Sequence, residues 1–250
     1  MSNSDECLKR ENIMKKILYL LCLLPYVSHA ADAEVQKSEW KGEGELGYTS
    51  TSGNTNSDSL NARLGISKEK GQWKHTASIE SLKTTTDNVA SADSQVFKEK
   101  SRYKFGEKAY VFGKLRYEDD VFSGFDYQAA ISFGVGSQFV STEKHTLDAS
   151  IGLGYRSIKN SLTQETLEDS IVSGEAAYEY KISQTASFSE AISFESGDEN
   201  THSESETSLK SKINGNLSSK ISYLIKQNSD VPAGTEKTDK ILTVSLVYAF

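Results

Sequence analysis

The chain of 250 residues contains two cysteines, two prolines and no long apolar segment. Both cysteines, Cys7 and Cys22, lie in the first thirty residues, so the remainder of the chain has no disulfide and no cysteine ligand for a metal. After residue 30 no run approaches the roughly 20 apolar residues that a transmembrane helix needs. A disulfide scaffold and a helical membrane protein are therefore both excluded.

The N-terminus has the features of a secretory signal. Lys15 and Lys16 precede the apolar run 17–24, and the small residues Ser28 and Ala30 frame a cleavage site. We predict a signal peptide over residues 1–30, with Met14 as an alternative start, followed by a short periplasmic segment over 31–38. The remaining domain is predicted to span 39–250.

Basic side chains are fewer than acidic ones. The whole chain has 28 basic and 35 acidic side chains, and removal of residues 1–30 takes away 4 and 3 of these, which leaves a net charge of −8. A chain with this excess of carboxylates is a poor partner for nucleic acid.

The dominant pattern of the chain is an alternation of apolar and polar residues with a period of two. In its last ten residues, ILTVSLVYAF, the apolar residues Leu242, Val244, Leu246, Tyr248 and Phe250 fall on alternate positions and share one face of an extended strand. About twelve such runs follow Trp40, and short connections such as KEKGQ and STEK alternate with long polar ones such as TTTDNVASAD and SIKNSLTQETLEDS. Glycines inside these runs, including Gly134, Gly136, Gly152 and Gly154, are expected to face the interior and to make room for bulky neighbours.

Two folds satisfy this alternation. A soluble β-sandwich buries its apolar face, whereas a membrane barrel turns that face to lipid and encloses the charged one. Runs of about 9 to 13 residues fit tilted strands that cross hydrocarbon. Aromatic residues near the strand ends, Tyr103, Tyr110 and Tyr178 among them, fit interfacial girdles. We therefore predict an all-β fold, a transmembrane antiparallel up-and-down β-barrel of about 12 strands in the bacterial outer membrane.

Three stretches also resemble a known family. They are WKGEGELGYTSTSGNTN at 40–56, YEDDVFSGFDYQ at 117–128 and LDASIGLGYR at 147–156. Together they resemble the YdiY-like family of salt-induced outer-membrane proteins, whose domain has no assigned function. The resemblance implies an outer-membrane barrel linked to salt or osmotic stress, and it transfers no catalytic residue. The aromatic end of the chain, Tyr248 and Phe250, resembles the signal that the outer-membrane assembly machinery reads.

The histidines and the acidic loops offer little chemistry. His75 and His145 are expected beside short turns, and His202 in an outer loop, so a hydrolase could use only His202. We predict no enzyme, no cofactor and no metal site. Acidic residues expected in outer loops could hold Ca²⁺ or Mg²⁺ that bridges lipopolysaccharide, or could simply be solvated: Glu118, Asp119, Asp120, Asp198, Glu199, Glu204 and Glu206.

The charged interior is the main candidate site. Cationic residues predicted to point inward are Lys98, Lys100, Arg102, Lys104, Lys114 and Arg116, and acidic ones are Glu43, Glu45, Glu175 and Glu179. If the lumen is open, the opposed walls would orient and filter small polar or anionic solutes. Alternatively the charges pair across the lumen and fill it. The corresponding functions are a narrow channel for small polar solutes or ions, or a structural barrel that contacts only lipid, lipopolysaccharide and the assembly machinery.

Overall fold

A computed structural model of the protein describes residues 40–51, 57–87, 89–120 and 123–250. Within these ranges there are twelve strands: β1 (Trp40–Thr51), β2 (Ser57–Lys70), β3 (Trp73–Thr86), β4 (Val89–Lys104), β5 (Ala109–Asp120), β6 (Phe125–Ser141), β7 (His145–Asn160), β8 (Thr166–Lys181), β9 (Ala186–Ser196), β10 (Thr201–Asn214), β11 (Leu217–Asn228) and β12 (Thr238–Ala249). Over the same residues no helix is long and apolar enough to cross a membrane. The predicted signal peptide, 1–30, and periplasmic segment, 31–38, lie outside the described residues.

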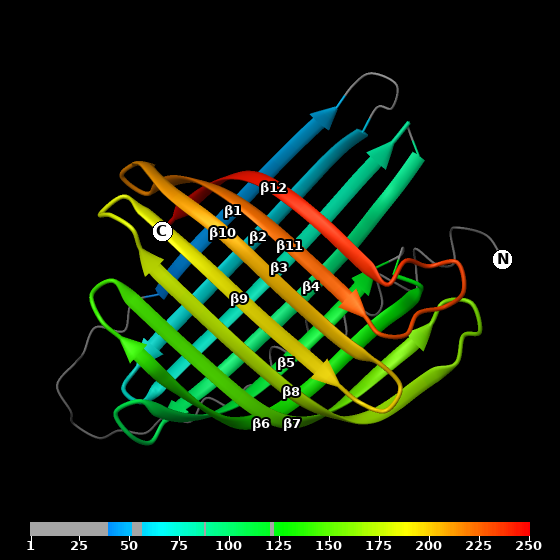
Figure 1. Ribbon diagram of the computed structural model, residues 1–250, viewed down its shortest axis with the longest axis horizontal. Helices are drawn as coiled ribbons and strands as arrows, with labels where there is room; N and C mark the ends of the chain where they lie inside the picture. Colours follow the sequence, from blue (N-terminus) through cyan, green and yellow to red (C-terminus); the bar gives the residue numbers. More distant parts are fainter. Residues whose placement is uncertain (1–39, 52–56, 88, 121–122) are drawn as a thin grey trace. The chain divides into compact units, whose positions relative to one another are not determined.

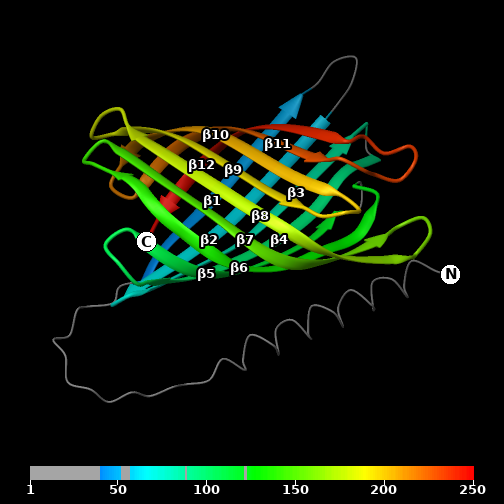
Figure 2. The ribbon, with the colours of Figure 1, turned by 60° about the horizontal axis from the view of Figure 1, so that its bottom comes forward.

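The strands form one closed sheet. Each strand pairs antiparallel with its neighbours in sequence, and β12 returns to pair with β1 (Figures 1 and 2). Because the sheet is closed, neither its first nor its last strand is a free edge. Membranes require this of β-structure, since an open edge would expose unpaired backbone groups to lipid. The predicted fold, an up-and-down barrel of about twelve antiparallel strands, is confirmed.

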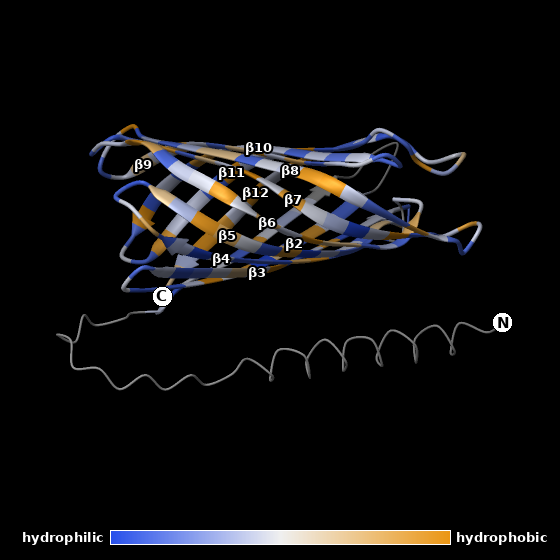
Figure 3. Ribbon diagram, turned by 90° about the horizontal axis from the view of Figure 1, so that it is seen from below, coloured by the Kyte–Doolittle hydropathy of each residue, from blue (hydrophilic) through white to orange (hydrophobic). Residues whose placement is uncertain are grey.

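The two faces of the sheet differ in chemistry. Large apolar side chains are exposed, with Leu153 at 70% and Leu242 at 64%. Hydrophobic and hydrophilic residues alternate along the strands (Figure 3). Because neighbouring residues of a strand face opposite sides, this alternation follows directly from the period of two. An exposed apolar belt around an enclosed polar interior is typical of transmembrane barrels.

The seam between the first and last strands is short. Residues 43–47 of β1 pair with 245–249 of β12, and Gly42 and Phe250 exchange two further backbone hydrogen bonds of 2.7 and 2.9 Å. A Cβ atom on Gly42 would lie only 2.2 Å from the ring of Phe250, so the ring covers this glycine. Beyond this seam, residues 48–51 pair only with β2, and 238–244 pair only with β11.

The connections at the two ends of the barrel differ less in length than the sequence predicted. At one end, called here the short-turn end, strands are joined by 71–72, 105–108, 142–144, 182–185 and 215–216. At the other, the loop end, they are joined by 52–56, 87–88, 121–124, 161–165, 197–200 and 229–237. Much of the polar sequence assigned to loops, such as TTTDNVASAD, continues the strands, because polar residues past the apolar belt still form ladder hydrogen bonds. The prediction of uniformly long outer loops was wrong.

One predicted girdle residue lies inside the barrel. Tyr110 is almost fully buried, and its hydroxyl donates a hydrogen bond of 2.6 Å to Asp148. Gly136 makes room for it, since a Cβ there would lie 2.3 Å from the tyrosine ring. Outward aromatics do cluster at the short-turn end, where His145 stacks on Tyr178 and Tyr180.

Candidate functional site

The lumen contains a cavity of about 670 Å³. Its lining starts near the short-turn end, at Lys41 and Ala249, and reaches Arg116, His202 and Glu204 deeper in the barrel. Inward residues near the short-turn end, such as Glu43, have exposed side chains. The cavity is therefore accessible from the short-turn end and ends at a group of charged side chains.

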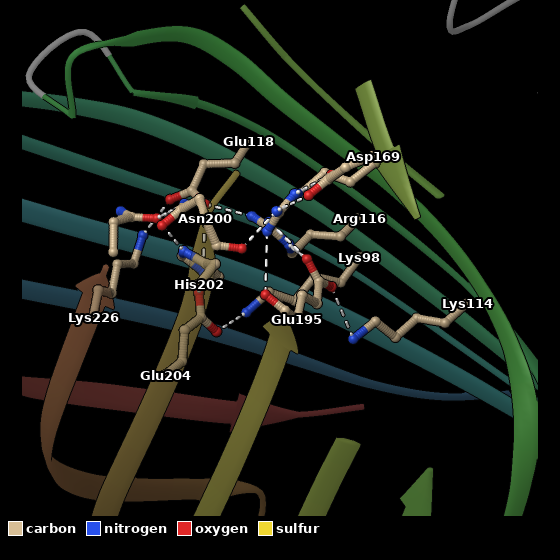
Figure 4. A network of polar contacts seen from close by, with 12 residues as sticks. Lys98, Lys114, Arg116, Glu118, Asp169, Glu195, Asn200, His202, Glu204 and Lys226 are labelled. Atoms are coloured by element: carbon tan, nitrogen blue, oxygen red, sulfur yellow. Dashed lines mark hydrogen bonds and ion pairs between the residues drawn. The ribbon is translucent and has the colours of Figure 1, made fainter. Parts of the chain in front are cut away.

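That group, called here the charge cluster, consists of Lys98, Arg116, Glu118, Glu195, His202, Glu204 and Lys226 (Figure 4). Two of its ion pairs cross the lumen. Lys98 of β4 binds Glu204 of β10 at 2.7 Å, and Lys226 of β11 binds Glu118 of β5 at 2.7 Å. These strands lie opposite each other in the ring, so the two pairs bridge the barrel from wall to wall.

Arg116 links the Lys226–Glu118 bridge to Glu195. Its guanidinium donates to Glu118 at 2.6 Å and, through Nε and Nη2, to Glu195 of β9 at 3.0 and 2.8 Å. All three side chains are at least nine-tenths buried. Buried charges of this kind are tolerated only when they are paired and hydrogen bonded, and this cluster meets both conditions.

A second group of buried residues lies beyond the cluster, toward the loop end. Arg156, which is 0% exposed, forms a double hydrogen bond with Asp169 at 2.8 and 3.2 Å. It also donates to the backbone carbonyls of Glu195 and Asn200 at 3.1 and 2.6 Å. We call this group, together with the buried residues Gln128, Ile158 and Ile171, the loop-end layer. It packs the part of the lumen between β6 and β10.

Nearer the short-turn end the pairs are more accessible. Glu175 of β8 accepts hydrogen bonds from Lys100 and Lys114 at 2.5 and 2.8 Å. Arg102 binds Asp148 at 3.1 Å. Thus the cationic strands β4 and β5 are tied to the acidic residues of β7 and β8, and their opposite charges cancel locally.

A further network of ion pairs lies on the lumen side of the seam between β1 and β12. Lys220 of β11 binds Glu45 of β1 at 3.2 Å and Glu206 of β10 at 2.7 Å, and Ser245 of β12 donates to Glu45 at 2.6 Å. Lys210 also pairs with Glu43. These contacts hold β1 against strands from the C-terminal third of the chain.

Ion pairing thus extends through the lumen. Each of the following inward cations lies within 4.0 Å of a carboxylate: Arg63, Lys98, Lys100, Arg102, Lys114, Arg116, Arg156, Lys210, Lys220 and Lys226. The sequence left open whether the inward charges line an open lumen or pair and fill it; in the structure they pair, but the lumen keeps the cavity of about 670 Å³. Two of the predicted lumen charges, Lys104 and Glu179, lie instead at the exposed rim of the short-turn end.

Six residues that were predicted in outer loops lie in strands instead: Glu118, Asp119 and Asp120 in β5, and His202, Glu204 and Glu206 in β10. His202, Glu118 and Glu204 are buried in the charge cluster. Glu206 points into the lumen from β10. The signal was present, because Glu204 and Glu206 continue the alternation of Ser208 and Lys210. The sequence analysis did not identify Glu195, Lys220 or Lys226 as site residues either.

Fold and site together define a transmembrane-type β-barrel whose charged lumen contains a cavity closed on one side by ion pairs. Residues 44–250 match the family described as "Protein of unknown function, DUF481", and the chain belongs to that family. It is 28% identical over 225 residues to the Escherichia coli (strain K12) protein described as "Uncharacterized protein YdiY", with 87% of this chain and 86% of that protein covered. The predicted YdiY-like membership is confirmed.

Two solved structures share the fold. The NanC porin superposes with a TM-score of 0.51 at 13% identity, with 84% of this chain and 98% of the porin covered. An outer membrane channel from Pseudomonas putida F1 gives a TM-score of 0.53 at 9% identity, with 91% of this chain and all of that chain covered. At these identities the likeness concerns the arrangement of strands.

Proposed function

We propose that the protein is a narrow outer-membrane channel for small polar solutes or ions, and that the structure represents its closed form. The observation that carries the proposal is the charged cavity that extends along the lumen and stops at the charge cluster. Closure by flexible ion-paired side chains can be reversed by rotamer changes, whereas a lumen closed by an apolar core cannot. The structural neighbours described as a porin and an outer membrane channel support the same function.

The charges of the lumen bear on selectivity. Because the inward cations are matched by carboxylates, the pathway has no large field of one sign, and we expect weak discrimination between anions and cations. Location in the outer membrane is part of the proposal and is supported by the exposed apolar belt. Contact with lipopolysaccharide, recognition of Tyr248 and Phe250 by the assembly machinery, and a link to salt or osmotic stress are supported by the sequence patterns and family resemblance.

A structural, non-conducting barrel is the second candidate. It is favoured by the loop-end layer, in which Arg156 and Ile158 are almost completely buried. Conductance separates the two functions, because a structural barrel conducts in no state.

The test is a planar bilayer measurement on purified protein whose folding is checked by its heat-dependent gel shift. The double variant Glu118→Gln/Lys226→Met removes the bridge between β5 and β11 at nearly constant volume, and we expect larger conductance steps than in the wild type. The control Glu69→Gln/Lys104→Met removes a pair of 2.8 Å at the exposed short-turn rim, and should conduct like the wild type. Folded protein that stays silent in all three forms at every voltage would refute the channel.

A further inference from the structure

The charge cluster contains one group whose hydrogen bonds define its protonation state. His202 is 3% exposed, lines the inner end of the cavity and has both ring nitrogens next to oxygen atoms. Its Nδ1 lies 3.1 Å from Oδ1 of Asn228, and its Nε2 lies 3.3 Å from Oε1 of Glu204 and 3.9 Å from Oε2 of Glu118.

The orientation of the two asparagines follows from backbone contacts. The backbone N–H of Asp230 donates to Oδ1 of Asn200 at 3.1 Å, which identifies that atom as the oxygen. The amide nitrogen of Asn200 therefore donates to Asn228 at 2.8 Å, so the Asn228 atom facing His202 is also an oxygen. Because an oxygen can only accept here, Nδ1 of His202 must carry a proton.

The second ring nitrogen faces carboxylates. If Nδ1 carries the only proton, the lone pair of Nε2 points at Glu204 and Glu118, and acceptor meets acceptor. The geometry is satisfied when Nε2 is also protonated and the ring is an imidazolium. His202 and the two carboxylates place ligand atoms within 4.8 Å of one another, a spacing that could also suit a metal ion.

The surrounding charges favour a proton over a metal. Groups that face this site are Lys98 from β4, Lys114, Arg116 and Glu118 from β5, Glu195 from β9, Glu204 from β10 and Lys226 from β11. Four cations already surround the three carboxylates, so a divalent ion would add two further positive charges to a buried site. A proton brings one, and it forms a hydrogen bond that the carboxylates are placed to accept.

We propose that His202 is a proton-operated latch of the charge cluster. This inference rests on the proposed channel function and concerns how the channel is opened and closed. The protonated ring holds Glu204 and Glu118 in the positions that bridge the lumen. Loss of the Nε2 proton toward higher pH leaves a lone pair facing both carboxylates. Glu204 and Glu118 then lose this donor, and the charge cluster holds the inner end of the cavity less tightly closed.

Nuclear magnetic resonance of the full chain labelled with ¹⁵N-histidine tests the protonation state directly. His75 and His145, near the short-turn end, serve as internal references, and the His202→Gln variant assigns the signal of His202. Across a pH titration we expect two protonated ring nitrogens while the latch is closed, and an Nδ1–H neutral ring once it has opened. A signal of the neutral ring throughout would overturn the latch.

Conductance across the same titration tests the consequence. We expect wild-type conductance to rise about tenfold or more across the pH range in which His202 loses its proton, equivalent to about 1.4 kcal/mol in the balance of open and closed forms. His202→Gln should conduct at the upper level at all pH values, and His202→Lys, which retains the charge, at the lower level. The control His145→Gln should keep the wild-type profile.

The outcomes separate the two proposals. If Glu118→Gln/Lys226→Met forms a pore but the wild-type profile is flat, or if His202→Gln keeps the wild-type profile, the channel stands and the latch is wrong. Silence of every variant at every pH would overturn both.

Discussion

Replacement of Asp169 by asparagine should destabilise the barrel far more than an ordinary loss of one surface charge. Asp169 and Arg156 form a fully buried pair joined by two hydrogen bonds, of 2.8 and 3.2 Å. Asparagine has nearly the same shape, but it presents an NH₂ group or a neutral oxygen to a guanidinium that stays charged and unhydrated. Removal of one partner from such a pair costs about 3–5 kcal/mol.

The neighbouring pair of Asp126 and Lys159 provides the matched control. It has a similar distance, 2.8 Å, but its two side chains are about one-third exposed. Water and counterions screen an exposed pair, so Asp126→Asn should cost only about 0–1 kcal/mol. The two variants involve the same chemical change and differ in burial.

Urea unfolding of the protein in lipid vesicles, followed by the fluorescence of Trp40 and Trp73, measures both costs. At about 3 kcal/mol the ratio of folded to unfolded protein falls more than about a hundredfold at fixed denaturant. The dependence of the unfolding free energy on urea should stay unchanged, which would show that the unfolded state is the same. Equal costs for Asp169→Asn and Asp126→Asn would refute the importance of the buried pair.

Three further changes test other parts of the barrel. Gly42→Val should displace the ring of Phe250 and reduce the yield of folded, heat-modifiable protein, whereas Gly44→Val, on the same face of β1 with no atom within 4 Å of its Cβ, should behave like the wild type. Glu175→Gln removes the carboxylate that binds Lys100 and Lys114, and should shift the reversal potential in a salt gradient toward anion selectivity. Glu179→Gln, at the exposed rim, should leave the reversal potential unchanged. Equal shifts in the two variants would contradict the pairing at Glu175. Tyr110→Phe removes a buried hydrogen bond to a carboxylate and should lower the unfolding free energy by about 1.5–3 kcal/mol, more than Tyr155→Phe, whose hydroxyl binds Glu168 on the exposed face.

The strands and their faces could be predicted from the sequence because both depend on local geometry. The alternation of Leu242, Val244 and Leu246 requires only that side chains point to opposite sides of an extended chain. The boundaries were harder to predict. Polar residues such as Glu204 and Glu206 look like loop sequence, yet a strand continues wherever its neighbours supply hydrogen bonds.

Ion-pair partners could not be predicted from composition. Lys98 meets Glu204 because of the register in the six consecutive strand pairings between β4 and β10 and the shape of the closed sheet, and neither is encoded in a local pattern. The position of His202 depends in addition on β10 beginning at Thr201, inside the polar segment SGDENTHSE. If the alternation of inward and outward residues had been continued along the whole of β10 and β11, Glu204, Glu206 and Lys226 would have been identified as inward residues. Their contacts would still have been unknown.

The short seam has a consequence for how the barrel folds. Every other pair of adjacent strands is a hairpin formed by residues close in sequence, but Glu45 and Ser245 must meet across 200 residues. Relative to a hairpin of about 10 residues, the chain entropy lost on this closure is larger by about 2.6 kcal/mol. Pairing of β1 with β12 should therefore be the slow event of folding. The contacts of Glu45 with Lys220 and Ser245, which no isolated hairpin contains, would form only when the ring is complete.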